Sequence, residues 1–254
     1  MTGLTVLITG GASGIGFGIA SHFGQLGHRV ILADINMEAA TEAAKSLQQQ
    51  SIDASAVYLN MADKTQIAKI TQSLPYPVDV LVNNAGIQHV APLDDFPADK
   101  WQLLIDVMLV GPALLTQALL PTMKQRNFGR IINLGSIHSL IASPFKSAYV
   151  AAKHGLIGFA KTLALEVGEQ NITINTLCPS YVKTPLVEQQ IVAQAKSNHL
   201  SEYDVVNKIM LEPMPKKAFI EIEELAHAAA FLLGPGAKNM TAQTIVLDGG
   251  WIAK

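Results

Sequence analysis

Short apolar runs alternate with longer segments of helical periodicity along the whole chain. The apolar runs are continuous and rich in β-branched residues, which is typical of parallel strands covered by helices on both faces. They lie at 4–8, 29–34, 56–59, 78–83, 130–135, 172–178 and 244–248. The helical segments lie at 14–26, 37–49, 63–73, 98–123, 147–168 and 222–233. This order predicts one doubly wound parallel α/β sheet, with residues 1–254 forming a single domain.

Residues 185–220 interrupt this alternation. The segment is polar, contains "LEPMPKK" and shows no strand pattern. We expect it to form two short helices that act as a mobile flap over a binding site.

The longest uncharged stretch runs from 107 to 123 and is interrupted by Gly111, Pro112 and Pro121. It is shorter than the roughly 18–20 apolar residues that a membrane-spanning helix needs. We therefore expect a helix buried in the core or in a subunit interface, and no association with a membrane.

Composition narrows the functional classes. The 254 residues are 49% hydrophobic and carry a net charge of −2, which gives no electrostatic basis for binding nucleic acid or an anionic membrane surface. The single cysteine, Cys178, indicates a reducing compartment without structural disulfides. The start "MTGLTVLITGG" shows no signal peptide, so we expect a cytoplasmic protein.

A glycine-rich turn follows the first predicted strand. The segment "LTVLITGGASGIG" places Gly10, Gly14 and Gly16 between this strand and the first helix. Such a turn aims backbone N–H groups at a pyrophosphate, at a helix N-terminus whose dipole favours anions. Glycine turns also make plain strand-to-helix connections, and the spacing here differs from the common G-x-G-x-x-G. Its place in the first βαβ unit nevertheless favours a Rossmann-type dinucleotide site.

Asp34 ends the second predicted strand, 24 residues after Gly10. A carboxylate at this point accepts hydrogen bonds from a ribose diol and repels a 2′-phosphate. No arginine or lysine lies in the glycine turn or directly after Asp34 to neutralise such a phosphate. These features favour NAD over NADP, whereas the competing interpretation makes Asp34 a turn residue that caps the strand end.

Ser136 follows the strand at 130–135, at the edge of the sheet where open α/β folds bind ligands. Tyr149 and Lys153 lie four residues apart in "SAYVAAKHG", hence on one helix face. A neighbouring cation favours the phenolate of a tyrosine, whose ordinary pKa near 10 makes it a poor base. We predict that Tyr149 is a general acid/base and that Ser136 hydrogen-bonds the substrate oxygen. The alternative is a helix edge that faces water.

Several segments together form a specific pattern. They are "TGGASGIG" (9–16), "NNAG" (83–86), Ser136, "YVAAK" (149–153), "CPSYVKTP" (178–185) and the C-terminal "LDGGW". With these segments the chain resembles the short-chain dehydrogenase/reductase family. The resemblance implies hydride transfer with a nicotinamide cofactor. It also implies a homotetramer or dimer built partly from the helices at 98–123 and 147–168.

The resemblance extends the set of cofactor residues. It implies that Lys153 contacts the nicotinamide ribose, and that Val182 and Thr184 contact the carboxamide. It places Asn84 and Ala85 near the adenosine. The complete set predicted for NAD is Gly10, Ser13, Gly14, Ile15, Gly16, Asp34, Asn60, Met61, Asn84, Ala85, Gly86, Tyr149, Lys153, Pro179, Val182 and Thr184. No metal ligand is predicted.

Within the family, four segments are similar to the D-3-hydroxybutyrate dehydrogenases: "NNAGIQHVAPLDDFP" (83–97), "ASPFKSAYVAAKHG" (142–155), "TPLVEQQI" (184–191) and the ending "VLDGGW". By position, this similarity nominates Gln88, His138, Lys146 and Gln190 as ligands of a substrate carboxylate, beside Ser136 and Tyr149. A short hydroxy acid needs a cation and hydrogen-bond donors, and Lys146 supplies a point charge. Taken singly, the lysine and Gln190 read equally well as solvated residues, and the histidine as a structural one.

The chain departs from the family at one notable position. The family usually carries an asparagine seven residues after its tryptophan, where this chain has Met108 after Trp101. That asparagine helps to hold a water that extends a proton relay from the lysine. A methionine side chain cannot make those hydrogen bonds, although its backbone carbonyl can. We expect a weakened or rewired relay. Smaller departures are Asn60, Ser180 and Tyr181.

Three hypotheses follow. The first is NAD-dependent oxidation of D-3-hydroxybutyrate to acetoacetate. The second is an NAD(P)H-dependent reductase of 3-oxoacyl or other ketones. The third is a cofactor-binding protein with little turnover because of Met108.

Overall fold

A single parallel sheet of seven strands organises the protein. The computed structural model describes residues 3–253, except the side chain of Leu186. The strands are β1 (Thr5–Thr9), β2 (Arg29–Asp34), β3 (Ala54–Tyr58), β4 (Val80–Asn83), β5 (Gly129–Leu134), β6 (Ile172–Pro179) and β7 (Thr244–Leu247). Their order is β3-β2-β1-β4-β5-β6-β7, which confirms the predicted doubly wound sheet.

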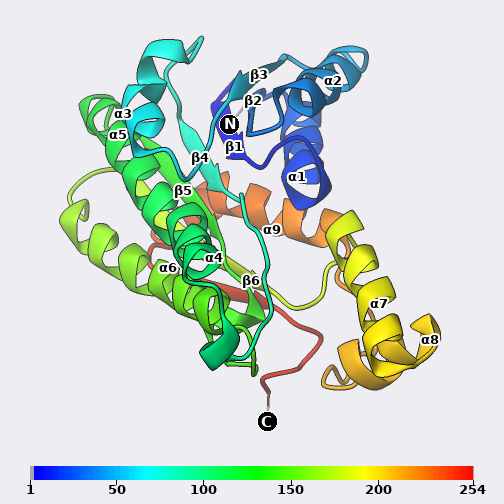
Figure 1. Cartoon of the computed structure of the whole chain (residues 1–254). Helices are drawn as coiled ribbons and strands as arrows, with labels where there is room; N and C mark the ends of the chain where they lie inside the picture. Colours follow the sequence, from blue (N-terminus) through cyan, green and yellow to red (C-terminus); the bar gives the residue numbers. More distant parts are fainter. Residues whose placement is uncertain (1–2, 254) are drawn as a thin grey trace.

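Helices cover both faces of this sheet (Figure 1). One face carries α1 (Gly14–Gln25), α2 (Met37–Gln48) and α9 (Ile222–Leu233), and α1 packs on α9. The other face carries α3 (Lys64–Ser73), α5 (Gly111–Gln125) and α6 (Ser147–Glu166). The helix α4 (Ala98–Ile105) packs against α6.

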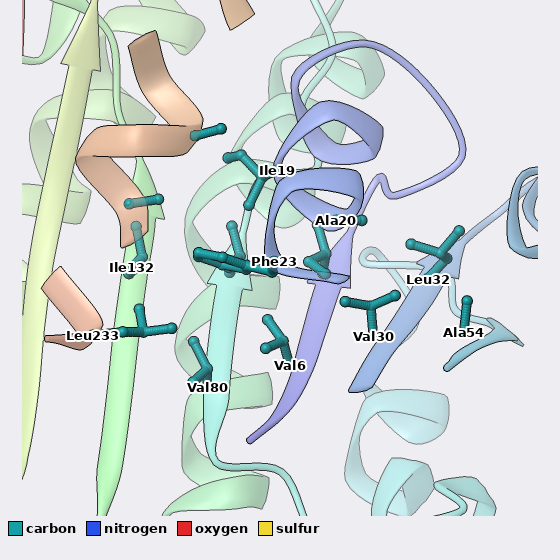
Figure 2. Packing of buried hydrophobic residues seen from close by; sticks show 14 of the residues in the cluster. Val6, Ile19, Ala20, Phe23, Val30, Leu32, Ala54, Val80, Ile132 and Leu233 are labelled. Carbon is teal, nitrogen blue, oxygen red and sulfur yellow. The ribbon is translucent and has the colours of Figure 1, made fainter. Parts of the chain in front are cut away.

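Successive residues of one strand enter two different hydrophobic cores because both faces are covered. In β1, Val6 and Ile8 join the cluster beneath α1 and α9, whereas Leu7 joins the cluster on the opposite face. Figure 2 shows Phe23 of α1 and Val80 of β4 among the side chains of the first cluster. Burying each such side chain stabilises the fold by about 1.5–3 kcal/mol. This packing explains why the strands read as continuous apolar runs.

The helix predicted at 98–123 is present and extends to Gln125. Between α4 and α5, residues Asp106–Val110 adopt a π-helical turn, so that Ala98–Gln125 is one helix of 28 residues. The turn precedes Pro112, which has no N–H to donate to a helical hydrogen bond. By length and composition this helix is able to span a membrane, contrary to the sequence-based expectation. It packs instead on α3, α6 and β5.

The segment after β6 is helical, as predicted. It contains α7 (Pro185–Asn198), α8 (Glu202–Val205) and a second π turn, Val206–Met210. Figure 1 shows α7 and α8 at one end of the molecule, beside the C-terminal segment. The buried residues Val187, Val205 and Met210 hold these helices together. The motion of this flap stays a prediction.

Candidate active site

One cavity of about 610 Å³ collects the predicted site residues. It opens where β1, β2, β4, β5 and β6 end, and α7 borders it. Every residue predicted to bind cofactor or substrate lines this cavity, except Gly16. The site is therefore brought together by the carboxyl ends of parallel strands.

The glycine turn has a backbone that only glycine adopts without strain. Gly10 and Gly14 have φ angles of +62° and +55°, and α1 begins at Gly14. Gly16 has no room for a side chain, because a Cβ atom there would lie 2.3 Å from the Gly10 carbonyl oxygen. Its contact with a cofactor stays a prediction. The turn thus presents a helix N-terminus to the cavity, as an anion site requires.

Asn84 ties the end of β4 to this turn. Its Nδ2 donates to the carbonyl oxygens of Thr9 and Gly10, at 2.9 and 3.1 Å. The Thr9 hydroxyl in turn accepts the backbone N–H groups of Asn84 and Ala85, each at 3.0 Å. The predicted adenosine-side residues therefore also fix the shape of the glycine turn.

Asp34 lines the cavity. It also makes hydrogen bonds that are typical of a turn residue capping a strand end, which is the alternative role considered for it above. Its carboxylate accepts the N–H of Ala12 at 3.2 Å and that of Asn36 at 3.0 Å. The two cations among the described lining residues, Lys146 and Lys153, lie at the Ser136 end. The Asp34 end thus presents a carboxylate without a neighbouring cation in the lining.

Ser136 is held by a closed pair of hydrogen bonds at the end of β5. Its hydroxyl accepts the N–H of His138 at 3.2 Å, and the Ser139 hydroxyl accepts the N–H of Ser136 at 3.1 Å. Residue 135 is glycine because the side chains of Thr176, Cys178 and Ser139 fill the space of a Cβ. Ser136 is 7% exposed. These two hydrogen bonds fix the position of its side chain.

Tyr149 and Lys153 lie on α6 beside Ser136. The Lys153 Nζ lies 5.6 Å from the centroid of the Tyr149 ring and donates to the Leu134 carbonyl oxygen at 2.5 Å. Burial raises the pKa of Tyr149, and a hydrogen bond with Ser136 opposes this effect. Burial also lowers the pKa of Lys153 to about 8. The cation is thus adjacent as predicted, but burial has the largest effect on the phenol.

Met108 fills an apolar space against α6. It is 1% exposed, packs with Ala148 and Ala152, and lies in the π turn between α4 and α5. Its sulfur lies close to Gly86, which lines the cavity: a Cβ atom placed on Gly86 would lie 3.6 Å from this sulfur. The side chain contributes no hydrogen bond to the site.

Lys146 directly precedes α6, after a constrained turn. The preceding Phe145 has a φ angle of +67°, and its carbonyl oxygen accepts the N–H of Ala91 at 3.0 Å. This bond links the segment after Gln88 to the start of α6. Burial lowers the pKa of Lys146, and no acidic side chain among residues 3–253 pairs with it. The cavity therefore contains a partly buried cation that lacks a counter-ion in the protein.

Gln88 and Gln190 border the same cavity, from the end of β4 and from α7. The Gln88 Oε1 accepts the N–H of His89 at 3.1 Å, which leaves its amide group as a donor. His138 has both ring nitrogens engaged. Nδ1 lies 3.5 Å from the Ser136 hydroxyl, and Nε2 lies 2.7 Å from the Ser143 hydroxyl.

The geometry matches a known family. Residues 4–195 match the sequence profile described as short chain dehydrogenase. The chain is a short-chain dehydrogenase.

Proteins of known sequence or structure match this short-chain dehydrogenase over nearly its whole length. An uncharacterized oxidoreductase of Bacillus subtilis is 41% identical over 251 residues, with 98% of each chain covered. A D-beta-hydroxybutyrate dehydrogenase of Rhizobium meliloti is 40% identical, covering 98% of this chain and 99% of its own. The solved actinorhodin polyketide ketoreductase with NADPH is 29% identical, with a TM-score of 0.93 and 99% of each chain covered. The protein is accordingly an oxidoreductase of this family.

Tyr181 and Trp251 form an aromatic side of the cavity, and the position of Trp251 there was not predicted from the sequence. Trp251 stacks on Tyr181 at 5.9 Å and meets the ring of His138 edge-on at 6.3 Å. It is held by Asp248, whose carboxylate accepts the N–H groups of Gly250 and Ile252. The Gly249 carbonyl oxygen of the same turn accepts the N–H of Lys216. A C-terminal residue reaches the site only because β7 pairs with β6, and no local pattern encodes that pairing.

Proposed function

We propose that this dehydrogenase interconverts D-3-hydroxybutyrate and acetoacetate with NAD as the cofactor. The observation that carries the proposal is the unpaired, partly buried Lys146 beside Ser136 and Tyr149. Leaving a cation partly desolvated without a counter-ion is unfavourable unless a ligand anion neutralises it. The carboxylate of a short hydroxy acid is such an anion. The Rhizobium meliloti relative supports the same substrate.

The cavity fits a nicotinamide dinucleotide. The turn at Gly10–Gly14 offers backbone N–H groups to a pyrophosphate, and Asp34 offers a carboxylate to a ribose diol. Among the described lining residues no cation lies near Asp34, which supports NAD, although the ketoreductase relative was solved with NADPH. Lys153 and Thr184 line the part of the cavity where the nicotinamide half would lie.

Ser136, at the end of β5, and Tyr149, on α6, have different roles in the proposed reaction. When bound, a nicotinamide cofactor would supply the hydride acceptor for C3 of the substrate. Tyr149 takes the proton of the substrate hydroxyl, and Ser136 stabilises the charge that develops on the oxygen. Lys146, Gln88 and Gln190 hold the carboxylate. His138 can bind the carboxylate through Nε2 only if the contact between Nε2 and the Ser143 hydroxyl breaks.

The experiment that tests the proposal follows NADH formation from NAD and each enantiomer of 3-hydroxybutyrate. We expect turnover of the D enantiomer and a much lower rate with the L enantiomer. A rate with the D enantiomer no higher than with the L enantiomer would refute the substrate. A preference for NADP over NAD would refute the cofactor.

The second candidate function is reduction of 3-oxoacyl or other ketones with NADPH. It is favoured by the likeness to the polyketide ketoreductase. Turnover of ethyl acetoacetate, which lacks a carboxylate, discriminates the two candidates. A rate equal to that with acetoacetate favours this second function, because Lys146 would then have no anion to bind.

We also propose a cytoplasmic homotetramer that buries the outer surfaces of α4, α5 and α6. Leu165 on α6 is 86% exposed, and burying it in a subunit interface would be favourable. Light scattering of the purified protein gives the mass that tests this assembly.

A further inference from the structure

One backbone hydrogen bond joins the two segments that carry Gln88 and Lys146. The N–H of Ala91 donates to the carbonyl oxygen of Phe145 at 3.0 Å. Ala91 lies three residues after Gln88, in the segment 84–92 that has no regular secondary structure. Phe145 lies directly before Lys146, which precedes α6. The bond therefore connects two parts of the cavity wall that are far apart in the sequence.

The backbone of Phe145 has a conformation that its side chain does not explain. Its φ angle is +67°, in the left-handed region that residues with a Cβ atom rarely adopt. The residue is 54% exposed, so burial of the ring offsets little of the cost of this conformation. Hydrogen bonds of the backbone around Phe145 must therefore stabilise it.

Two further hydrogen bonds hold the turn before α6. The Ser143 hydroxyl lies 2.7 Å from Nε2 of His138, in the short helical turn Ile137–Ser139. The hydroxyl of Ser147, the first residue of α6, accepts the indole N–H of Trp101 at 3.2 Å. The turn is thus attached to the residues after β5 and to α4, as well as to the segment after β4.

The turn leaves two successive side chains in different surroundings. The ring of Phe145 is exposed, whereas the side chain of Lys146 lines the cavity and is partly buried. Burial lowers the pKa of Lys146, as expected for an ammonium group kept away from water. A lysine has a flexible stem and a strongly hydrated head, so an unconstrained side chain would extend into solvent. The backbone at residue 145 therefore helps to keep this cation in the cavity.

The segment of Gln88 is held on the other side of the same bond. The Gln88 Oε1 accepts the N–H of His89 at 3.1 Å, and the ring of His89 packs edge-on against Phe96 at 5.0 Å between centroids. The segment is therefore attached at Gln88 and His89 by their own contacts, and at Ala91 by the bond to the turn before α6.

We propose that Ala91 and Phe145 are positioning residues, which hold Gln88 and Lys146 at the separation that binds one carboxylate. The inference rests on the proposed function, in which these two side chains bind the carboxylate of the hydroxy acid. Ala91 and Phe145 do not line the cavity and act through their peptide groups. A site that is formed before the substrate enters loses less free energy to ordering on binding.

The first test removes the hydrogen-bond donor. Ala91→Pro deletes the N–H group without adding a polar side chain. We expect KM for D-3-hydroxybutyrate to rise roughly twofold to tenfold, the fold-change that corresponds to one hydrogen bond, with little change in kcat. An unchanged KM would overturn the proposal.

Val90→Pro is the matched control for a proline in this loop. Val90 is 54% exposed, and its N–H makes no hydrogen bond within residues 3–253. This variant should keep the KM of the wild type. A rise in KM equal to that of Ala91→Pro would overturn the proposal, because rigidity of the loop would then explain both effects.

The second test changes the backbone preference of residue 145 and leaves Ala91 intact. Asparagine adopts the left-handed region more readily than other residues with a Cβ atom, whereas β-branched valine avoids it. Both substitutions remove the exposed ring. We expect Phe145→Val to raise KM as Ala91→Pro does, and Phe145→Asn to stay close to the wild type. Equal effects of the two substitutions would overturn the proposal.

A double-mutant cycle distinguishes positioning from a general structural role. In the Lys146→Ala background, Ala91→Pro should raise KM much less than in the wild type, because a positioning residue acts through the side chains that it positions. A rise in KM of the same factor in both backgrounds would overturn the proposal.

A further measurement needs no substrate, so it separates failure of the positioning role from failure of the proposed substrate. In protein labelled with ¹³Cε-lysine, the signal of Lys146 is assigned by its loss in Lys146→Ala. Its pKa should lie below that of the exposed Lys183 and should rise in Ala91→Pro and Phe145→Val, but not in Val90→Pro or Phe145→Asn. A pKa of Lys146 that is the same in all these proteins would refute the positioning role. A shifted pKa in a protein that does not turn over 3-hydroxybutyrate would support that role and refute the substrate alone.

Discussion

The Lys153 ammonium donates a hydrogen bond of 2.5 Å to the Leu134 carbonyl oxygen, which joins α6 to the end of β5. These two elements carry Tyr149 and Ser136. The bond therefore helps to fix the distance between the proposed proton acceptor, Tyr149, and Ser136, the residue proposed to stabilise the substrate oxygen. It also holds the cation inside the protein, where burial lowers its pKa to about 8.

Replacing Tyr149 by phenylalanine should lower kcat by about 10²–10⁴-fold, because the phenol acts in the chemical step. The affinity for NAD should change little, since the ring keeps its packing. Steady-state assays and fluorescence titration with NAD measure the two quantities. Tyr203→Phe, at a position 75% exposed, is the matched control. Turnover that survives the Tyr149 change would remove its assignment as the acid/base.

Lys146→Ala should raise KM for D-3-hydroxybutyrate about tenfold to a hundredfold, with a smaller fall in kcat. A hydrogen bond to a charged group contributes about 1.5–3 kcal/mol, and a carboxylate contact binds ground and transition states alike. The exposed Lys183→Ala provides the control for loss of a positive charge. An unchanged KM would argue against an anionic substrate.

Met108→Asn should raise kcat if the relay behind Lys153 is impaired in this protein. The substitution buries an amide in an apolar cluster, so the free energy of unfolding should fall by about 1–3 kcal/mol. Met108→Leu keeps the volume without adding hydrogen bonds and should leave kcat unchanged. A wild type that binds NAD without any turnover would favour the cofactor-binding hypothesis.

His138 should make stability depend on acid pH. Its pKa is lowered from 6.5 to about 4 in the folded protein, so the unfolded chain binds more protons between these values. Its contribution is complete above pH 6.5 and is lost as the pH falls to 4, by on the order of 2 kcal/mol at pH 5. Chemical denaturation at pH 7.5 and pH 5 measures the loss. His138→Gln should show a smaller difference, whereas the exposed His199→Asn should behave as the wild type.

The fold could be predicted because its signals are local. Continuous apolar strands, glycine turns and helical periodicity place most element boundaries within two residues of those observed. The π turn at Asp106–Val110 was not predicted, because the sequence from 98 to 123 shows one continuous helical pattern. Gly16 does not line the cavity, and its close packing on the Gly10 carbonyl oxygen could not be seen in the motif that it shares with Gly14.

The site could be predicted in part because residues after parallel strands meet at one edge. The resemblance to the family added Gln88, Lys146 and Gln190, which all line the cavity. The contact between His138 and Ser143 was not expected, since it depends on the path of the loop after β5. Trp251 was missed because only the β6–β7 pairing brings it to the cavity.

The stacking of Trp251 on Tyr181 gives the protein a built-in optical probe. The chain has two tryptophans, and the other, Trp101, donates its indole N–H to Ser147 on α6. A Trp101→Phe variant would emit from Trp251 alone. Because the turn of Trp251 is bonded to Lys216 at the end of the flap segment, its emission should report both ligand entry and flap position in the millisecond range without any added label.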